Sequence, residues 1–118
     1  MQHNNAYDAK TKQNLDEFVS CLRDEVKFIK LTKDEYVSAN KLMAEKMINI
    51  YDLKDTFIRM IPIDDKPAIE DTVTLLVDIV RDGLSRLAAD AREGMSYELF
   101  LKRIDEEQKI WFEQLRIS

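Results

Sequence analysis

Glycine and proline are nearly absent from this sequence, since each occurs only twice in 118 residues. All-β folds need a turn about every ten residues, and those turns depend on glycine and proline. The shortage of both, with charged residues at 35% and hydrophobic residues at 45%, favours long helices joined by few loops. A chain of this length is expected to form one domain around one core.

Histidine and cysteine are also scarce, with one of each. The histidine, His3, lies in a polar stretch (residues 1–6) that is expected to be frayed. One histidine cannot build a di-iron bundle site. Because it lies outside the predicted helices, we also expect no Ser-His or Cys-His nucleophilic pair and no histidine-based zinc site. The single Cys21 cannot pair within the chain, and its position favours a small half-buried side chain over a reactive thiol. The sequence therefore predicts no metal and no cofactor.

Neither a secretory leader nor a membrane-spanning segment is expected. No charged-then-apolar segment opens it, and no uncharged apolar run approaches about 20 residues. We expect a soluble, cytoplasmic protein. Its net charge of −5 lacks the basic field that binds nucleic acid or an anionic membrane, so neither is expected as a partner. Another protein, a basic one included, fits this charge.

Four stripes of apolar residues at three- and four-residue spacing predict four amphipathic helices. Each stripe is long and the links between them are short, which is typical of antiparallel neighbours. The sequence therefore predicts an all-α, up-down four-helix bundle that forms a single domain over residues 1–118. The helices are expected to begin near Tyr7, Lys33, Lys66 and Tyr97.

Several helix ends are marked by single residues. Thr32 and Glu35 have the spacing of a capping box, which starts the second helix, and Pro62 ends it. Gly94 suits the left-handed conformation that terminates a helix. Ser96 then caps the last helix.

Other positions interrupt the stripes. Lys54 would fall on the apolar stripe of an unbroken second helix, so we expect a break near Tyr51–Asp55, with one long helix as the alternative. Gly83 indicates close approach of a neighbouring helix. Asn40 and Gln108 are polar within apolar stripes. They either hydrogen-bond across the bundle or sit at its ends, and the sequence leaves both open.

Paired carboxylates raise one enzymatic alternative. All-α nucleotide pyrophosphatases hold Mg²⁺ with acidic residues at i and i+3 on facing helices. No Glu-x-x-Glu occurs, and the nearest matches, Asp52-x-x-Asp55 and Asp90-x-x-Glu93, are expected at helix ends. No catalytic motif is found. A second alternative, an acidic nucleic-acid mimic, is weakened by the interspersed lysines and arginines.

Apolar residues off the main stripes suggest a second surface. Several on one side of a bundle would mark a partner or dimer interface, although on the second helix they could simply broaden the core face. We therefore expect a small, acidic, non-enzymatic protein-interaction module of inhibitor, immunity or adaptor type, acting through an exposed helix face, with a homodimer left open. The candidate surface residues are Leu99, Ile110 and Ile117 on the last helix and Leu42, Leu53 and Met60 on the second.

Overall fold

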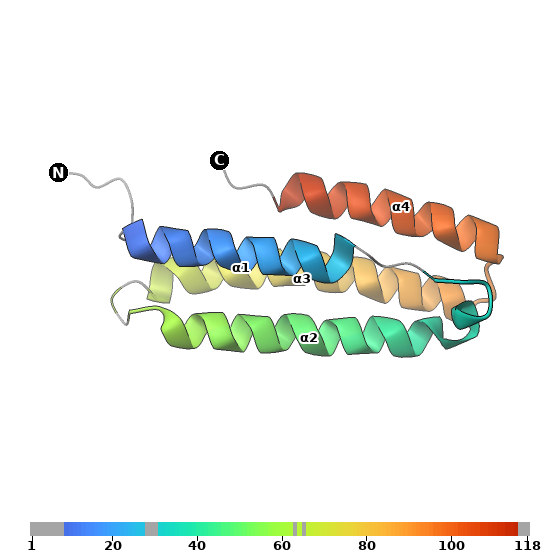
Figure 1. Ribbon diagram of the computed structural model, residues 1–118, viewed down its shortest axis with the longest axis horizontal. Helices are drawn as coiled ribbons and strands as arrows, with labels where there is room; N and C mark the ends of the chain where they lie inside the picture. Colours follow the sequence, from blue (N-terminus) through green and yellow to red (C-terminus); the bar gives the residue numbers. More distant parts are fainter. Residues whose placement is uncertain (1–8, 28–30, 63, 65, 116–118) are drawn as a thin grey trace.

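The four predicted helices are present in the computed structural model, which describes residues 9–27, 31–62, 64 and 66–115. They are α1 (Ala9–Lys27), α2 (Ala39–Met60), α3 (Lys66–Arg92) and α4 (Tyr97–Gln114), and a short 3-10 helix, η1 (Glu35–Ser38), precedes α2. Successive helices run antiparallel (Figure 1), which confirms the up-down four-helix bundle. The molecule is elongated, at 56 × 23 × 18 Å.

The α2–α3 pair is the longest and most extensive packing in the bundle. α1 covers one end of this pair and α4 covers the other, so that α1 and α4 run side by side over a short stretch only (Figure 1). Each helix therefore packs chiefly against the helices next to it in sequence.

The apolar stripes meet in one core, as expected. Val77 is fully buried while Leu76 is half-buried, and Val37 is 88% exposed because it belongs to η1 and not to the helical register of α2. Side chains with no exposed surface are Leu22 and Val26 of α1, Met43 and Ile50 of α2, Ile69, Val73, Val77, Val80, Leu84 and Leu87 of α3, and Phe100, Trp111 and Leu115 at α4.

The predicted capping box is present at the start of the second helical segment. The Thr32 N–H donates to Oε1 of Glu35 at 2.9 Å, and the Glu35 N–H donates to Oγ1 of Thr32 at 3.2 Å. These bonds stabilise the carboxylate and hold the pKa of Glu35 below its ordinary value. The box starts η1, however, and the α-helix begins only at Ala39.

Two tyrosines fasten this segment to the start of α4. The Tyr36 hydroxyl donates to the carbonyl of Met95, and its ring lies 4.7 Å from that of Phe100. The Tyr97 hydroxyl donates to the carbonyl of Leu31 at 2.6 Å. Both bonds join residues far apart in sequence, so they hold the link between α1 and α2 against the turn between α3 and α4.

The expected break near Tyr51–Asp55 is wrong, because α2 runs unbroken from Ala39 to Met60. Lys54 lies at the boundary with α3, where it lines a hollow with Glu70 and Thr74, and it is half-buried. A lysine in that position can pack its alkyl stem against the helices while its ammonium group stays in water. It therefore does not have to interrupt the stripe. The helix ends as predicted, with Ile61 extended (φ −83°, ψ 132°) before Pro62.

α4 approaches α3 closely at Gly83. A Cβ at this position would lie 2.5 Å from Cζ2 and from Nε1 of Trp111, so only glycine leaves room for the indole. The indole N–H donates to the carbonyl of Ile79 at 3.3 Å. The close approach indicated by the sequence is confirmed. Gly94 is left-handed (φ 84°) after α3, and Oγ of Ser96 accepts from the Leu99 N–H at 3.3 Å, as their positions predict.

Gln108 and Asn40, the two polar residues within the apolar stripes, have different roles in the structure. Nε2 of Gln108 donates across the bundle to the carbonyls of Val26 (2.8 Å) and Lys27 (3.3 Å). Those carbonyls belong to the last turn of α1, so the two bonds tie the end of α1 to α4. Asn40 is exposed in the first turn of α2. Of the two readings left open, the hydrogen bond across the bundle applies to Gln108 and the end position to Asn40.

Two ion pairs join α3 to α4. Arg86 donates to both carboxylate oxygens of Glu107, at 2.7 and 2.8 Å, which raises the pKa of Arg86. Arg103 donates to Asp90 at 3.3 Å. The bidentate geometry fixes the register of the two helices.

Some expectations lie outside the described residues. These are the fraying of residues 1–6, the start of the first helix near Tyr7 and the position of Ile117. In the part of the chain that is described, no helix has the length and apolar character needed to cross a membrane.

Candidate interaction surface

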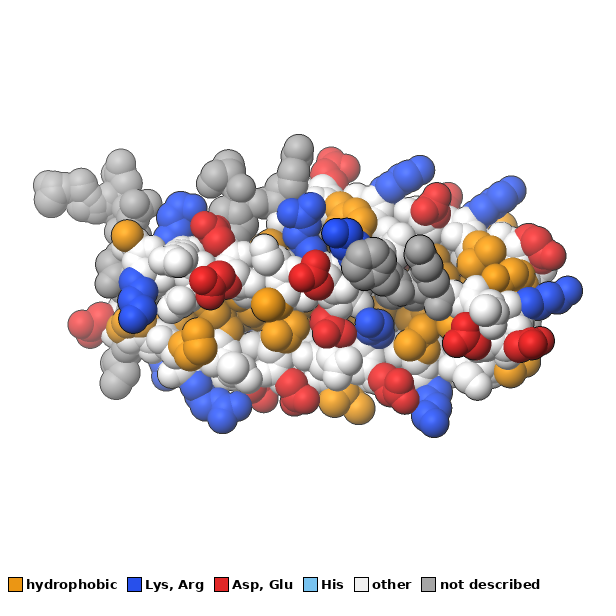
Figure 2. Space-filling model, in the orientation of Figure 1, with side chains coloured by type: hydrophobic (Ala, Val, Ile, Leu, Met, Phe, Trp, Pro, Cys, Tyr) orange, Lys and Arg blue, Asp and Glu red, His pale blue; other side chains and the backbone are white. Residues whose placement is uncertain are grey.

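An apolar hollow opens between α1 and α2. Its volume is about 130 Å³, and it is lined by Asn14, Glu17, Phe18 and Cys21 of α1 and by Leu53, Thr56, Phe57 and Met60 of α2. Figure 2 shows hydrophobic side chains gathered along the seam between these two helices. We call this hollow and its edges the α1–α2 groove.

The floor of the α1–α2 groove is a pair of stacked aromatic rings. Phe18 and Phe57 are 3% and 4% exposed, and their ring centroids lie 4.9 Å apart at an interplanar angle of 22°. Both residues also belong to the core, so the floor is held by the packing of the bundle. A floor of this kind is preformed and does not need to be ordered when a ligand arrives.

The walls of the groove leave apolar side chains open to solvent. Met60 is 53% exposed, and Leu53 is half-buried against the core. Cys21 is exposed, contrary to the half-buried position that the sequence favoured, because it lies on the edge of α1 that overhangs the groove. These three side chains surround the hollow above the rings.

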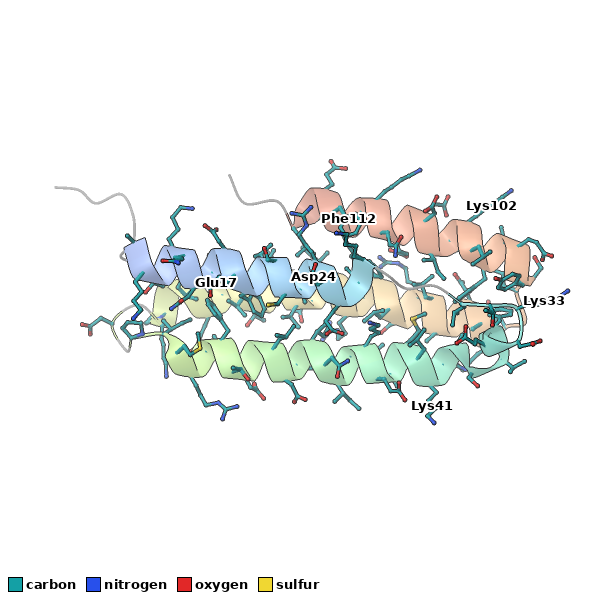
Figure 3. All side chains as sticks on the ribbon, in the orientation of Figure 1. Glu17, Asp24, Lys33, Lys41, Lys102 and Phe112 are labelled. Carbon is teal, nitrogen blue, oxygen red and sulfur yellow. The ribbon has the colours of Figure 1, made fainter. Side chains whose placement is uncertain are left out.

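Two carboxylates lie along the α1 edge of the groove. Glu17 lines the hollow, and Asp24 follows seven residues later on the same stripe of α1; Figure 3 labels both residues. Neither has an ion-pair partner among the described residues. Glu25 is already engaged, since Lys46 lies 3.5 Å away and Asn49 donates to it at 3.2 Å. The edge of α1 therefore offers two carboxylates with no counter-charge.

The candidate residues of the last helix do not form one apolar patch. Leu99 and Ile110 are 47% and 46% exposed on the outer face of α4. Arg103 and Glu106, which lie between them on the same face, form an ion pair at 3.6 Å. A charged band thus separates the two side chains, and their predicted companion Ile117 lies outside the described residues.

The candidate residues of the second helix divide into two groups. Leu53 and Met60 meet in the α1–α2 groove. Leu42 is half-buried on the same edge of α2, about three turns away and beyond the Lys46–Glu25 pair. There it lines a broad, open hollow of about 500 Å³ whose other residues are mostly charged or polar: Leu31, Asp34, Glu35, Ser38, Lys41 and Glu45.

The carboxylates considered for magnesium are not assembled into a site. Asp52 and Asp55 lie in the middle of α2 and not at a helix end as expected, because that helix is unbroken. Asp90 is engaged by Arg103 in the last turn of α3, and Glu93 follows that helix. Within the described residues, no three His, Cys, Asp or Glu side chains are grouped so as to hold a metal ion.

The aromatic floor and the exposed Cys21 were not recognised as site residues from the sequence. Phe18 and Phe57 follow the core stripes of their helices, which gives no sign of a groove above them. The hollow forms only where α1 and α2 pack side by side, because its lining residues come from both helices. Comparison with protein-family models, curated proteins and solved structures finds no match to this chain.

Proposed function

We propose that the protein is a small, acidic, non-enzymatic module of the cytoplasm that binds another protein through the α1–α2 groove. The observation that carries this proposal is the apolar hollow above the Phe18–Phe57 floor, with Met60 exposed on its wall. Surface methionines beside aromatic rings are typical of adaptable binding sites. Such a groove would serve a role of inhibitor, immunity or adaptor type.

The size of the hollow favours a side chain over a cofactor. Pockets for small-molecule ligands usually enclose about 300–1,000 Å³, well above the 130 Å³ of this hollow. One large apolar side chain fits such a volume, and its full burial contributes about 1.5–3 kcal/mol. That is the contribution of an anchor residue at the centre of a protein interface.

Cys21 allows the proposal to be tested on the native chain. It is the only cysteine, it is exposed and it lines the groove, so alkylation with N-ethylmaleimide fills the hollow without changing any charge. Three baits are compared in extracts of the source cells: the native protein, the alkylated native protein, and Cys21→Ser treated with the same reagent. Far-UV circular dichroism checks that each bait is folded.

We expect at least one protein to be retained by the native bait and by the treated Cys21→Ser bait. The alkylated native bait should not retain that protein. Ile48→Gln serves as a surface control, because Ile48 is 61% exposed on α2 but does not line the groove. The same retained proteins on all baits would contradict the proposal. Self-association is measured separately, by the solution mass of the native and alkylated proteins.

A further inference from the structure

The α1–α2 groove combines an apolar floor with two carboxylates along its α1 edge. Beneath it lie the stacked rings of Phe18 and Phe57, and beside it stand Glu17 and Asp24, with no partner charge among the described residues. On the α2 side, Lys46 is already held by Glu25. A ligand that enters this groove therefore meets apolar surface below and uncompensated negative charge on one side.

We infer that the groove receives a cationic amphipathic helix of another protein, with an apolar side chain seated between Met60 and Cys21 and basic side chains facing Glu17 and Asp24. This inference rests on the proposed function and adds the chemical class of the partner. Charge complementarity carries it, since opposite charges across an interface favour encounter and suppress partners of the wrong sign.

The spacing of the carboxylates suits a helix. Glu17 and Asp24 are two turns apart, or about 10 Å along the axis of α1. A partner helix that lies along the groove presents residues at the same seven-residue interval on one face. An apolar residue midway between two basic residues of that face would then point into the hollow beside Leu53.

A second copy of this chain is a poor occupant of the same groove. A two-fold interface places the same surface patch on both molecules. Glu17 and Asp24 of one molecule would then approach the same carboxylates of the other, and like charges brought together in an interface are unfavourable. The acidic edge therefore selects a different, basic protein.

The test uses the full chain and a synthetic peptide as the probe. The peptide is a helix of about four turns with leucines on one face and two arginines seven residues apart beside them. A second peptide has glutamates in place of the arginines, and a third has alanines in place of the leucines. Dissociation constants are measured by fluorescence anisotropy at low and at physiological ionic strength.

We expect the arginine peptide to bind more than about tenfold more tightly than the glutamate peptide at low salt, with a smaller difference at higher salt because the charges are exposed. The double variant Glu17→Gln with Asp24→Asn is expected to bind the arginine peptide about fivefold to tenfold less tightly. The matched control is Glu98→Gln with Asp105→Asn, which removes two exposed carboxylates seven residues apart on α4. This control should change affinity by less than about twofold.

The outcomes separate the two proposals. Equal binding of the arginine and glutamate peptides, or equal losses in both double variants, overturns the cationic partner while groove binding stands. If the alanine peptide binds as tightly as its parent and alkylation of Cys21 has no effect, the proposed function fails as well. Absence of binding by every peptide overturns both, and a dimer that alkylation dissociates replaces the basic partner with a second copy.

Discussion

Replacement of Gly83 by alanine tests whether the contact between α3 and α4 is as close as the structure shows. Two effects oppose each other. Alanine in the interior of a helix is favoured over glycine by about 1 kcal/mol. The added Cβ, however, would lie 2.5 Å from two atoms of Trp111, a rigid ring that is fully buried and donates to Ile79. Overpacking of a core costs about 1–3 kcal/mol, and displacement of the indole also weakens a hydrogen bond worth about 1 kcal/mol.

Steric overlap should therefore dominate, and we expect Gly83→Ala to lower the free energy of unfolding by about 1–3 kcal/mol. The measurement is urea denaturation followed by circular dichroism. The same substitution in a Trp111→Leu background removes the overlapping atoms, so only helix propensity remains and Gly83→Ala should stabilise by about 1 kcal/mol. A change of the same sign and size in both backgrounds would refute the close contact, since the two sites would then be independent.

Three further predictions concern polar groups. Gln108→Leu should cost about 1 kcal/mol and speed hydrogen exchange in the last turn of α1, because the bonds from Gln108 to the carbonyls of Val26 and Lys27 are lost; unchanged exchange there would contradict the role of Gln108. Burial raises the pKa of Tyr36, so its contribution to stability is complete below the ordinary pKa of 10.0 and is lost as the pH rises through the folded value. In alkali, the free energy of unfolding should therefore fall more steeply with rising pH for the native protein than for Tyr36→Phe. The lowered pKa of Glu35 acts in the opposite direction, with stability present above the ordinary pKa of 4.5 and lost as the pH falls through the folded value, and Glu35→Gln should remove that part of the acid sensitivity.

Most of the fold follows from signals that lie within single helices. The stripes predicted four helices, and Pro62, Gly94 and Ser96 marked ends that the structure reproduces. Prediction from single helices failed at a long side chain and at a tight turn. Lys54 suggested a break because its alkyl stem was not counted as apolar surface. Helical spacing also does not show that a 3-10 turn ahead of α2 leaves Val37 exposed.

The candidate surface was less accessible to sequence reasoning because it depends on two helices at once. Helical periodicity gives the direction of Leu53 or Met60 around α2, but not what stands opposite on α1. It likewise placed Leu99 and Ile110 on one face of α4 without showing that an ion pair divides them. Gln108 is a similar case, since its partners belong to a helix more than 80 residues away.

The short shared boundary of α1 and α4 has a consequence for folding kinetics. These helices are the most distant in sequence. Among the described residues their meeting depends on few interactions, which include the Gln108 bonds and the guanidinium of Arg23 at 5.7 Å from the ring centre of Phe112. Contacts between sequence neighbours such as α2 and α3 carry a smaller loop-closure cost and should form first. Substitutions at this boundary should therefore accelerate unfolding and leave the refolding rate nearly unchanged. The joint between the first and last helices is then where the native bundle begins to open.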